Sequence, residues 1–238
     1  MLHFATASAA EVGSGGTAAI MHTLRGTERV LQFARSSGVE RLLFASSGAV
    51  YGPQPTDLGQ IAETFPGAPD LADRASGYGE MKRLGELMCA STDGIDWVIA
   101  RGFCFVGPYL PLTDKFAVGS FIRDALSGRP IRIHGDGSPV RSYLYAADLA
   151  IWLPTLLVRG RTSAAYNVGS DQTISIRDVA RAVSEAAGSI DIEIAQKPAK
   201  VLSQYVPSID KARQELGLKV RTPFAAAIAR TIQWAQHR

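Results

Sequence analysis

The stretch RLLFASSGAVYG, residues 41–52, contains the strand around which the fold is predicted to form. Its residues Leu42, Leu43 and Phe44 are apolar without polar alternation, as in a strand covered on both faces of a parallel sheet. Two hydroxyl residues, Ser46 and Ser47, come where this strand is expected to end. The stretch therefore predicts a buried parallel strand with polar side chains at its carboxyl end.

Helical and strand patterns alternate along the rest of the chain. The helix before this strand is expected over about 18–36, because a Ser-Ser-Gly sequence at 36–38 is a typical helix end. Further helices are expected at about 76–90, 116–127, 147–158, 176–187, 208–216 and 223–236, strands at about 40–46, 96–101, 131–134 and 141–145, and a long loop over 52–75. This alternation predicts an α/β fold with a doubly wound sheet.

Composition limits the classes of protein to which the chain can belong. The 238 residues are 46% hydrophobic and 20% charged, as in an ordinary globular enzyme, and the net charge of +3 comes without a basic cluster, so no nucleic-acid partner is expected. Cys89 and Cys104 form no metal-ligand pattern, and we expect free thiols in a reducing cytoplasm. No membrane-spanning stretch or signal peptide is expected either.

Tyr78 and Lys82 lie four residues apart in the helix expected at 76–90. Residues i and i+4 share a helix face, so the Lys82 ammonium can approach the Tyr78 phenol and favour its ionised form. A tyrosine with the ordinary pKa of about 10 needs such help to act as a base in neutral water. On this spacing alone, a surface tyrosine beside a solvated lysine is the simpler interpretation. The surrounding motifs are needed to choose between it and a catalytic pair.

Several further motifs follow in a fixed order. They are RLLFASSGAVYG (41–52), YGEMK (78–82), ARGFCFVGP (100–108), IHGDG (133–137), RSYLY (141–145), DLA (148–150) and YNVG (166–169). In this order and spacing the chain resembles the extended short-chain dehydrogenase/reductases, the NAD-dependent nucleotide-sugar epimerase/dehydratase family, over about residues 1–238.

The resemblance implies an incomplete doubly wound, Rossmann-like parallel sheet with a smaller α/β substrate lobe. Residues 1–108 would form a partial NAD-binding domain, to which segments within about 130–160 return. Residues 109–238 would mainly form the substrate-binding lobe. The ligands would then lie between the two parts, at the carboxyl ends of the strands.

The start of the chain is expected to lack part of the family fold. Residues 1–7 are similar to the family's fourth strand, so the first three strands and the glycine-rich turn that receives the dinucleotide pyrophosphate are expected to be missing. Residues 13–18, GSGGTA, match the dinucleotide fingerprint, but no strand directly precedes them. We interpret them as a flexible turn leading into the helix at 18–36.

The resemblance assigns catalytic roles to three residues and names NAD as the cofactor. Ser47 would hydrogen-bond the sugar hydroxyl undergoing oxidation, Tyr78 would accept its proton, and Lys82 would lower the Tyr78 pKa and hold the nicotinamide ribose. The residues implied in cofactor binding are Ala5, Thr6, Ala45, Ser46, Tyr78, Lys82 and Phe103. For Ser46, packing at the strand end is the alternative interpretation.

The residues implied in substrate binding are Cys104, Arg132, Arg141 and Tyr205. Arg141 would meet the substrate diphosphate through bidentate hydrogen bonds, with a surface salt bridge as the alternative. The family often has Asn where Cys104 stands, so one substrate contact is expected to be lost there. The expected partner is a nucleotide-diphosphate sugar.

Two neutral residues, Gly48 and Ala49, bear on the type of reaction. Related dehydratases carry an Asp-Glu pair at these positions, and related decarboxylases carry Glu just before the following Val. Neutral side chains transfer no protons, so dehydration is disfavoured. The sequence thus predicts an epimerase-like oxidoreductase that acts by transient hydride transfer at a sugar hydroxyl.

Two other functions stay open at this point. One is a catalytically impaired, truncated homologue that binds a nucleotide sugar or a partner chain. The other is a dehydratase or reductase of the same family. Family members often form homodimers through the helices that correspond to about 18–36 and 76–90, although core packing is the alternative explanation for the apolar residues there.

Overall fold

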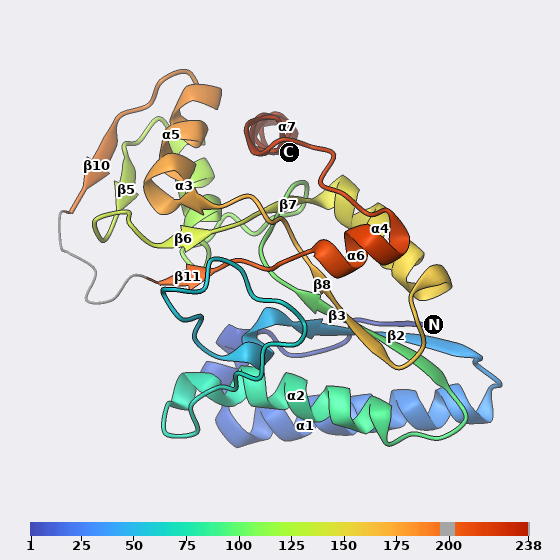
Figure 1. Ribbon diagram of the computed structural model, residues 1–238. Coiled ribbons are helices and arrows are strands. Elements are labelled where there is room, and N and C mark those ends of the chain that lie inside the picture. Colours follow the sequence, from blue (N-terminus) through green and yellow to red (C-terminus); the bar gives the residue numbers. More distant parts are fainter. Residues whose placement is uncertain (196–202, 238) are drawn as a thin grey trace.

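The computed structural model describes residues 1–195 and 203–237, and its centre is a four-stranded parallel sheet (Figure 1). The strands follow the order β1-β2-β3-β8 and are β1 (Leu2–His3), β2 (Arg41–Ser47), β3 (Asp96–Gly102) and β8 (Ala164–Val168). β2 and β3 pair along their whole length, so that Ser47 lies opposite Gly102. Because the strands are parallel, their carboxyl ends meet at one edge of the sheet, where ligands bind in open α/β folds.

Helices cover both faces of this sheet, which makes it doubly wound (Figure 1). α1 (Ala9–Ser36) and α2 (Gly77–Ala90) lie on one face, and α4 (Ala146–Arg159) and α6 (Asp210–Leu216) lie on the other. Phe44 packs in the core on the α1–α2 side, and its neighbour Leu43 packs on the α4–α6 side. Successive strand residues point to opposite faces, so this double coverage explains why β2 is apolar without alternation.

α1 begins earlier than the sequence predicted. The Ser8 hydroxyl accepts the N–H of Glu11, and the Glu11 carboxylate accepts the N–H of Ser8 at 2.7 Å, which is a capping box. The helix is broken at Gly16, where φ is 52° and ψ is −136°. The prediction of a flexible turn over 13–18 is therefore wrong except for this break, and the rest of the segment is helical.

The second lobe packs three helices against small sheets. Its helices are α3 (Ala117–Leu126), α5 (Ile176–Ala186) and α7 (Phe224–Gln236), and its strands are β4 (Phe105–Val106), β5 (Ile131–Ile133), β6 (Val140–Arg141), β7 (Leu144–Tyr145), β9 (Ile174–Ser175), β10 (Ile192–Ile194) and β11 (Gln204–Tyr205). Phe121, Val179 and Ile228 are buried among them. The strand predicted at about 141–145 is in fact two short strands, β6 and β7, which pair in different sheets.

More of the later sequence returns to the parallel sheet than predicted. α4 lies within the expected window of about 130–160, but β8 pairs with β3, and Ala212 and Leu216 of α6 pack in the core beside it. The returning part therefore also includes residues 164–168 and 210–216. The domain division at residue 108 stays a prediction.

The 52–75 loop leads from β2 to α2 and is hydrogen-bonded to the segment that follows β11. It follows the 3-10 helix η1 (Gly48–Tyr51) and runs into η2 (Arg74–Ser76) just before α2. Ile61 is fully buried in it, its N–H donates to the Val206 carbonyl at 2.9 Å, and its carbonyl accepts the Ser208 N–H at 2.8 Å. These bonds fix the loop against the segment that follows β11.

Candidate active site

Ser47, Tyr78 and Lys82 come together at the carboxyl end of β2. The Ser47 hydroxyl accepts the N–H of Ala49 at 3.1 Å and so caps η1. Ser47 is near enough to the Tyr78 phenol to lower its pKa, and Lys82 Nζ lies 5.9 Å from the centroid of the Tyr78 ring. The structure thus gathers the three side chains that the sequence singled out, and their catalytic roles stay a prediction.

Lys82 is a buried cation, with 2% of its surface exposed. Its ammonium donates to the Ala45 carbonyl at 2.7 Å and lies 5.2 Å from the centroid of the Phe44 ring. Burial lowers the pKa of Lys82 to about 8, and the carboxylate of Glu86, one helical turn further along α2, opposes that shift. Lys82 is therefore mostly charged at neutral pH and is held in one place.

The Tyr78 phenol does not have the lowered pKa expected from the sequence. Burial raises its pKa, and the hydrogen bond with Ser47 opposes the rise. The Lys82 ammonium instead directs a hydrogen bond to Ala45. Ser47 is the neighbouring group that lowers the Tyr78 pKa in this arrangement.

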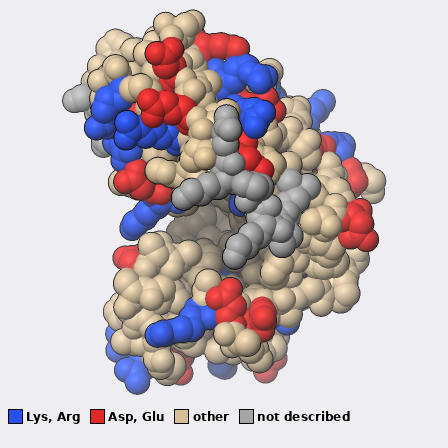
Figure 2. All heavy atoms as spheres, turned by 90° about the vertical axis from the view of Figure 1, so that its left-hand side faces the viewer, with Lys and Arg blue, Asp and Glu red and all other residues tan. Residues whose placement is uncertain are grey.

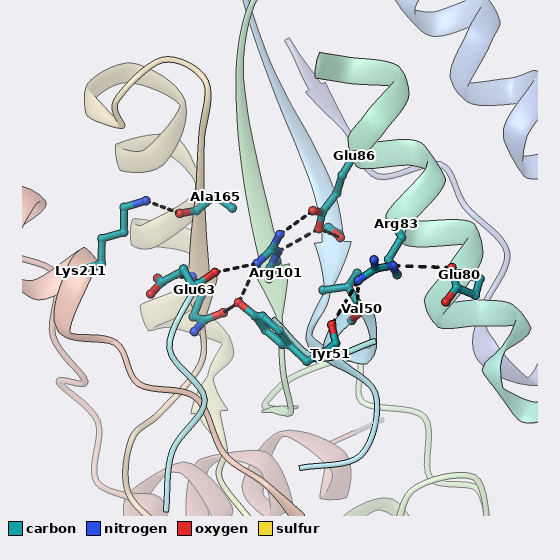
Figure 3. Close-up of polar contacts among 12 residues, drawn as sticks. Val50, Tyr51, Glu63, Glu80, Arg83, Glu86, Arg101, Ala165 and Lys211 are labelled. Atoms are coloured by element: carbon teal, nitrogen blue, oxygen red, sulfur yellow. Dashed lines mark hydrogen bonds and ion pairs between the residues drawn. The ribbon is translucent and has the colours of Figure 1, made fainter. Parts of the chain in front are cut away.

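A partly buried ion pair between Glu86 and Arg101 lies beside the site (Figure 3). Arg101, near the end of β3, donates from Nε and Nη2 to the two Glu86 oxygens at 3.0 and 2.7 Å. Ser46 donates to the same carboxylate at 2.5 Å. The Arg101 and Glu86 side chains are only 17% and 15% exposed, so these hydrogen bonds must offset the cost of removing two charges from water. The pair ties α2 to the ends of β2 and β3.

Arg101 also contacts the 52–75 loop, because its Nη1 donates to the Glu63 carbonyl at 3.4 Å (Figure 3). Its Nη1 donates to the Tyr51 hydroxyl at 2.9 Å, and its guanidinium carbon lies 4.9 Å from the centroid of the Tyr51 ring. The Tyr51 hydroxyl donates in turn to the side-chain oxygen of Asn167 at 2.8 Å. Sequence reasoning missed this network, although the position of Glu86 four residues after Lys82 on one helix is a signal that could have found it.

The residues implied in cofactor binding have different surroundings. Ala5 and Thr6 are exposed directly after β1, and Ala45 gives its carbonyl to Lys82. Ser46 turns its hydroxyl to Glu86, which favours the alternative interpretation of strand-end packing. Phe103 is 8% exposed and packs against the ring of Tyr205, with centroids 4.6 Å apart.

The described residues fit the nicotinamide half of NAD better than its pyrophosphate. Tyr78 and Lys82 place a phenol and an ammonium at the carboxyl end of the sheet, where dinucleotides bind in this type of fold. Residues 13–18 offer no comparable cradle for phosphates, because they lie within the α1 segment and not in a turn directly after a strand. The structure thus agrees with the rejection of that segment as a dinucleotide loop.

Three of the four residues implied in substrate binding lie together near Ser47. The Tyr205 hydroxyl donates to the carbonyl of Gly102, which lies opposite Ser47 in the sheet, at 3.5 Å. Ser47, Cys104 and Arg141 are all close enough to influence the pKa of the Tyr205 phenol. Arg141 donates to the Ser203 carbonyl at 3.0 Å and to its hydroxyl at 3.1 Å, and within the described residues it forms no salt bridge. Burial raises the pKa of Cys104 to about 11, so its thiol is neutral.

Arg132 lies apart from this group. Its side chain is 67% exposed and pairs with Glu193 on the neighbouring strand β10 at 2.9 Å. No contact among the described residues joins it to Ser47 or Tyr205, and its role in substrate binding stays a prediction. Ile131 and Ile133 on either side are buried, and the alternation of a strand therefore turns Arg132 outward.

The surface of the molecule is hollowed between the second lobe and the part that contains α1 and α2 (Figure 2).

Within residues 1–195 and 203–237, no cluster of three or more His, Cys, Asp or Glu side chains could hold a metal ion. The same residues contain no helix that is both long and apolar enough to span a bilayer.

Comparison with known proteins places this site in a family. The family model described as the NAD dependent epimerase/dehydratase family matches residues 1–169. The chain belongs to this family. UDP-glucuronic acid decarboxylase 1 of Xenopus tropicalis is 31% identical over 213 residues, which cover 88% of this chain and 50% of the relative. The dTDP-glucose 4,6-dehydratase of Streptomyces antibioticus is 28% identical over 242 residues, covering 98% of this chain and 69% of the relative.

Solved structures of epimerases share the fold. UDP-glucose 4-epimerase of Thermotoga maritima, solved with UDP-glucose, superimposes with a TM-score of 0.88 at 21% identity, covering 99% of this chain and 76% of that one. The UDP-glucose 4-epimerase of Thermus thermophilus, solved with NAD, gives 0.81 at 27% identity with the same coverage. The predicted Rossmann-like α/β fold is confirmed. The chain spans about half the length of the decarboxylases that it matches.

Proposed function

We propose that the protein is an NAD-dependent, epimerase-like oxidoreductase that acts on a hydroxyl of a nucleotide-diphosphate sugar. One observation carries the proposal: Ser47 is near enough to the Tyr78 phenol to lower its pKa, and the buried Lys82 ammonium lies 5.9 Å from the centroid of the same ring. A hydroxyl donor, a phenol and a fixed cation are the groups needed to take a proton from an alcohol as it is oxidised. Family membership supports NAD as the cofactor.

Each of these side chains has a role in the proposed reaction. Bound NAD would supply the hydride acceptor. Ser47 would hold the sugar hydroxyl, and Tyr78 would take the proton from its oxygen. Lys82, held by Ala45, would stabilise the negative charge that develops on the Tyr78 oxygen and bond the nicotinamide ribose. Tyr78 would return the proton to the oxygen as the hydride returns to the opposite face of the same carbon, so that the configuration is inverted with no net change in the cofactor.

The space around Gly48 favours epimerisation over dehydration. A Cβ at Gly48 would lie 2.6 Å from the Tyr205 hydroxyl and 2.7 Å from the Phe103 ring, so no larger side chain fits without movement. Gly48 and Ala49 also carry no group that could protonate a leaving hydroxyl. An oxidation followed by reduction at the same carbon needs no such group.

The exposed apolar side chains of α1 and α2 support a homodimer through these helices. Phe33 on α1 is 60% exposed, and Leu84 and Leu87 on α2 are 43% and 59% exposed. Leu84 and Leu87 line a cavity of about 740 Å³ together with Ile20 and Leu24 of α1. We expect a dimer by light scattering and a monomer for Leu87→Arg, and a wild-type monomer would exclude this assembly.

The two free cysteines agree with a cytoplasmic location.

The proposed activity is tested by incubating the full chain and NAD with UDP-, GDP-, CDP- and dTDP-sugars and separating the products. We expect one class of sugar to be converted to its epimer with no net change in NAD. A 4-keto-6-deoxy product would instead identify a dehydratase. Binding of a nucleotide sugar without conversion of any of them would favour the non-catalytic alternative.

A further inference from the structure

The first turn of α2 lies against η1 with no room for a side chain between the two backbones. A Cβ at Gly79 would be 2.6 Å from the Ala49 carbonyl oxygen and 2.8 Å from Cγ of Pro69, and real Cβ atoms almost never come within 3.0 Å of such atoms. Gly79 directly follows Tyr78, and Ala49 gives its N–H to the Ser47 hydroxyl at 3.1 Å. The contact therefore joins the two backbone segments that carry the side chains of the proposed reaction.

We propose that Gly79 and Arg83 are positioning residues that hold α2 against η1 and so set the separation of Tyr78 from Ser47. The inference rests on the proposed function, in which these two side chains act on the same sugar hydroxyl. Neither positioning residue needs to touch substrate or cofactor, because each acts through the placement of the first turn of α2.

The η1 side of the contact is fixed. The Ala49 carbonyl accepts the N–H of Gly52 at 3.2 Å, and the Ala49 N–H is held by Ser47. Gly52 has a φ of 69°, and a Cβ there would be 2.1 Å from the Ala68 carbonyl oxygen, so the end of η1 is also tightly packed. The Ala49 carbonyl would have to break a hydrogen bond to make room for a side chain. An atom added at Gly79 therefore displaces α2 and not η1.

Arg83 holds α2 against the same segment (Figure 3). Its Nη1 donates to the Val50 carbonyl at 3.1 Å and to the Gly67 carbonyl at 3.3 Å. Val50 belongs to η1 and Gly67 to the long loop that follows it. Because Arg83 comes four residues after Gly79, the two lie on one face of α2. The glycine permits the close approach, and the arginine holds it.

The middle of α2 is anchored to β2, so a displacement falls on the first turn. Lys82 donates to the Ala45 carbonyl at 2.7 Å, and Glu86 accepts from Ser46 at 2.5 Å. A Cβ at Gly79 reaches ordinary contact when its 2.6 Å approach becomes about 3.4 Å, which requires a movement of about 0.8 Å. A displacement of about 1 Å can lower a catalytic rate by about 100-fold.

The first test compares crystal structures of wild type, Gly79→Ala and Gly77→Ala without substrate. We expect the distance between the Ser47 and Tyr78 oxygens to grow by about 0.8 Å in Gly79→Ala. Gly77→Ala is the matched control in the same helical turn. Its Cβ would meet only apolar side chains of α1 at 3.4 Å, so the distance should stay unchanged.

Turnover of the accepted nucleotide sugar gives a second measurement. In Gly79→Ala, kcat should fall by about 50-fold while KM changes less than about twofold, because the substrate contacts remain and only the base is displaced. Arg83→Met, which removes the bonds to η1 and adds no atom to the contact, should lower kcat by about tenfold. Its control is Glu80→Gln, which removes only an ion pair of 3.6 Å with Arg83 and should leave kcat unchanged.

The distance between the Ser47 and Tyr78 oxygens decides the proposal even if the wild type converts no sugar, a result that would count against the proposed function alone. An unchanged distance in Gly79→Ala would overturn the inference. If Gly79→Ala does not fold, the same distance in Arg83→Met decides, and it should again increase. A fall in kcat without a longer distance would also contradict a positioning role.

Discussion

Charged side chains are buried to different degrees in two regions of the molecule. One region is formed by α2 and β2, and the other is the second lobe. Around α2, Lys82 is 2% exposed and the Glu86–Arg101 pair is 15–17% exposed, and all three are fixed by direct hydrogen bonds. In the second lobe, the Arg132–Glu193 pair is 55–67% exposed and projects from strands of three residues. The same types of residue are thus rigid parts of a site in one region and solvated surface groups in the other.

The largest difference is expected when the acidic partner of each ion pair is neutralised. Glu86→Gln leaves Arg101 mostly buried without its counter-charge and should lower the free energy of unfolding by about 3 kcal/mol. Glu193→Gln, the matched control, should change it by less than about 0.5 kcal/mol because that pair is exposed to water. Urea denaturation of the two variants measures both values, and equal losses would contradict the contrast.

The buried charge of Lys82 should make stability depend on pH. Its pKa is lowered to about 8 in the folded protein, so between about pH 8 and 10.5 the unfolded chain binds more protons, and stability rises with pH. The cost of burying the charge is fully present below pH 8 and disappears above the unfolded pKa.

The matched variant is Lys82→Met. Between pH 7.5 and 9.5, wild type should gain about 2 kcal/mol relative to Lys82→Met, as measured by the free energy of unfolding in urea. A difference between the two proteins that stays constant over this range would show that Lys82 has an ordinary pKa.

The sequence predicted the α2–β2 region well because its elements are long. Ser47 is the last residue of a seven-residue strand, and Tyr78 and Lys82 share one face of a 14-residue helix. Spacing along the chain therefore determines where these side chains lie. Glu86 was missed because its partners Ser46 and Arg101 come from two other elements. The predicted lowering of the Tyr78 pKa was wrong because burial, which spacing does not show, raises this pKa, and the Lys82 ammonium donates to the Ala45 carbonyl instead.

The second lobe was harder to predict because its strands are short. Arg132 was assigned to substrate binding from the family resemblance alone, and its neighbours Ile131 and Ile133 are buried, which turns its own side chain outward. The early start of α1 was also missed, although Ser8 and Glu11 form a capping box that the sequence contains.

The smallest of these effects concerns affinity for a nucleotide sugar. Arg141 is in the cluster with Tyr205 near Ser47, so Arg141→Ala should weaken binding about tenfold, since it removes charge-assisted hydrogen bonds to a diphosphate. Arg132→Ala should change affinity less than about twofold. Titration calorimetry with a nucleotide sugar that binds compares them, and a greater loss in Arg132→Ala would mean that the substrate lies in the outer part of the second lobe.

The central claim is that the Tyr78 phenol, held by Ser47 beside Lys82, is the base of a hydride-transfer site. The most direct measurement is turnover of the accepted nucleotide sugar by Tyr78→Phe, with Tyr109→Phe, an exposed phenol that packs on Trp234, as the control. We predict a fall of at least about 100-fold for Tyr78→Phe and no change for Tyr109→Phe, with both proteins folded as judged by circular dichroism. Full activity in Tyr78→Phe would contradict the account.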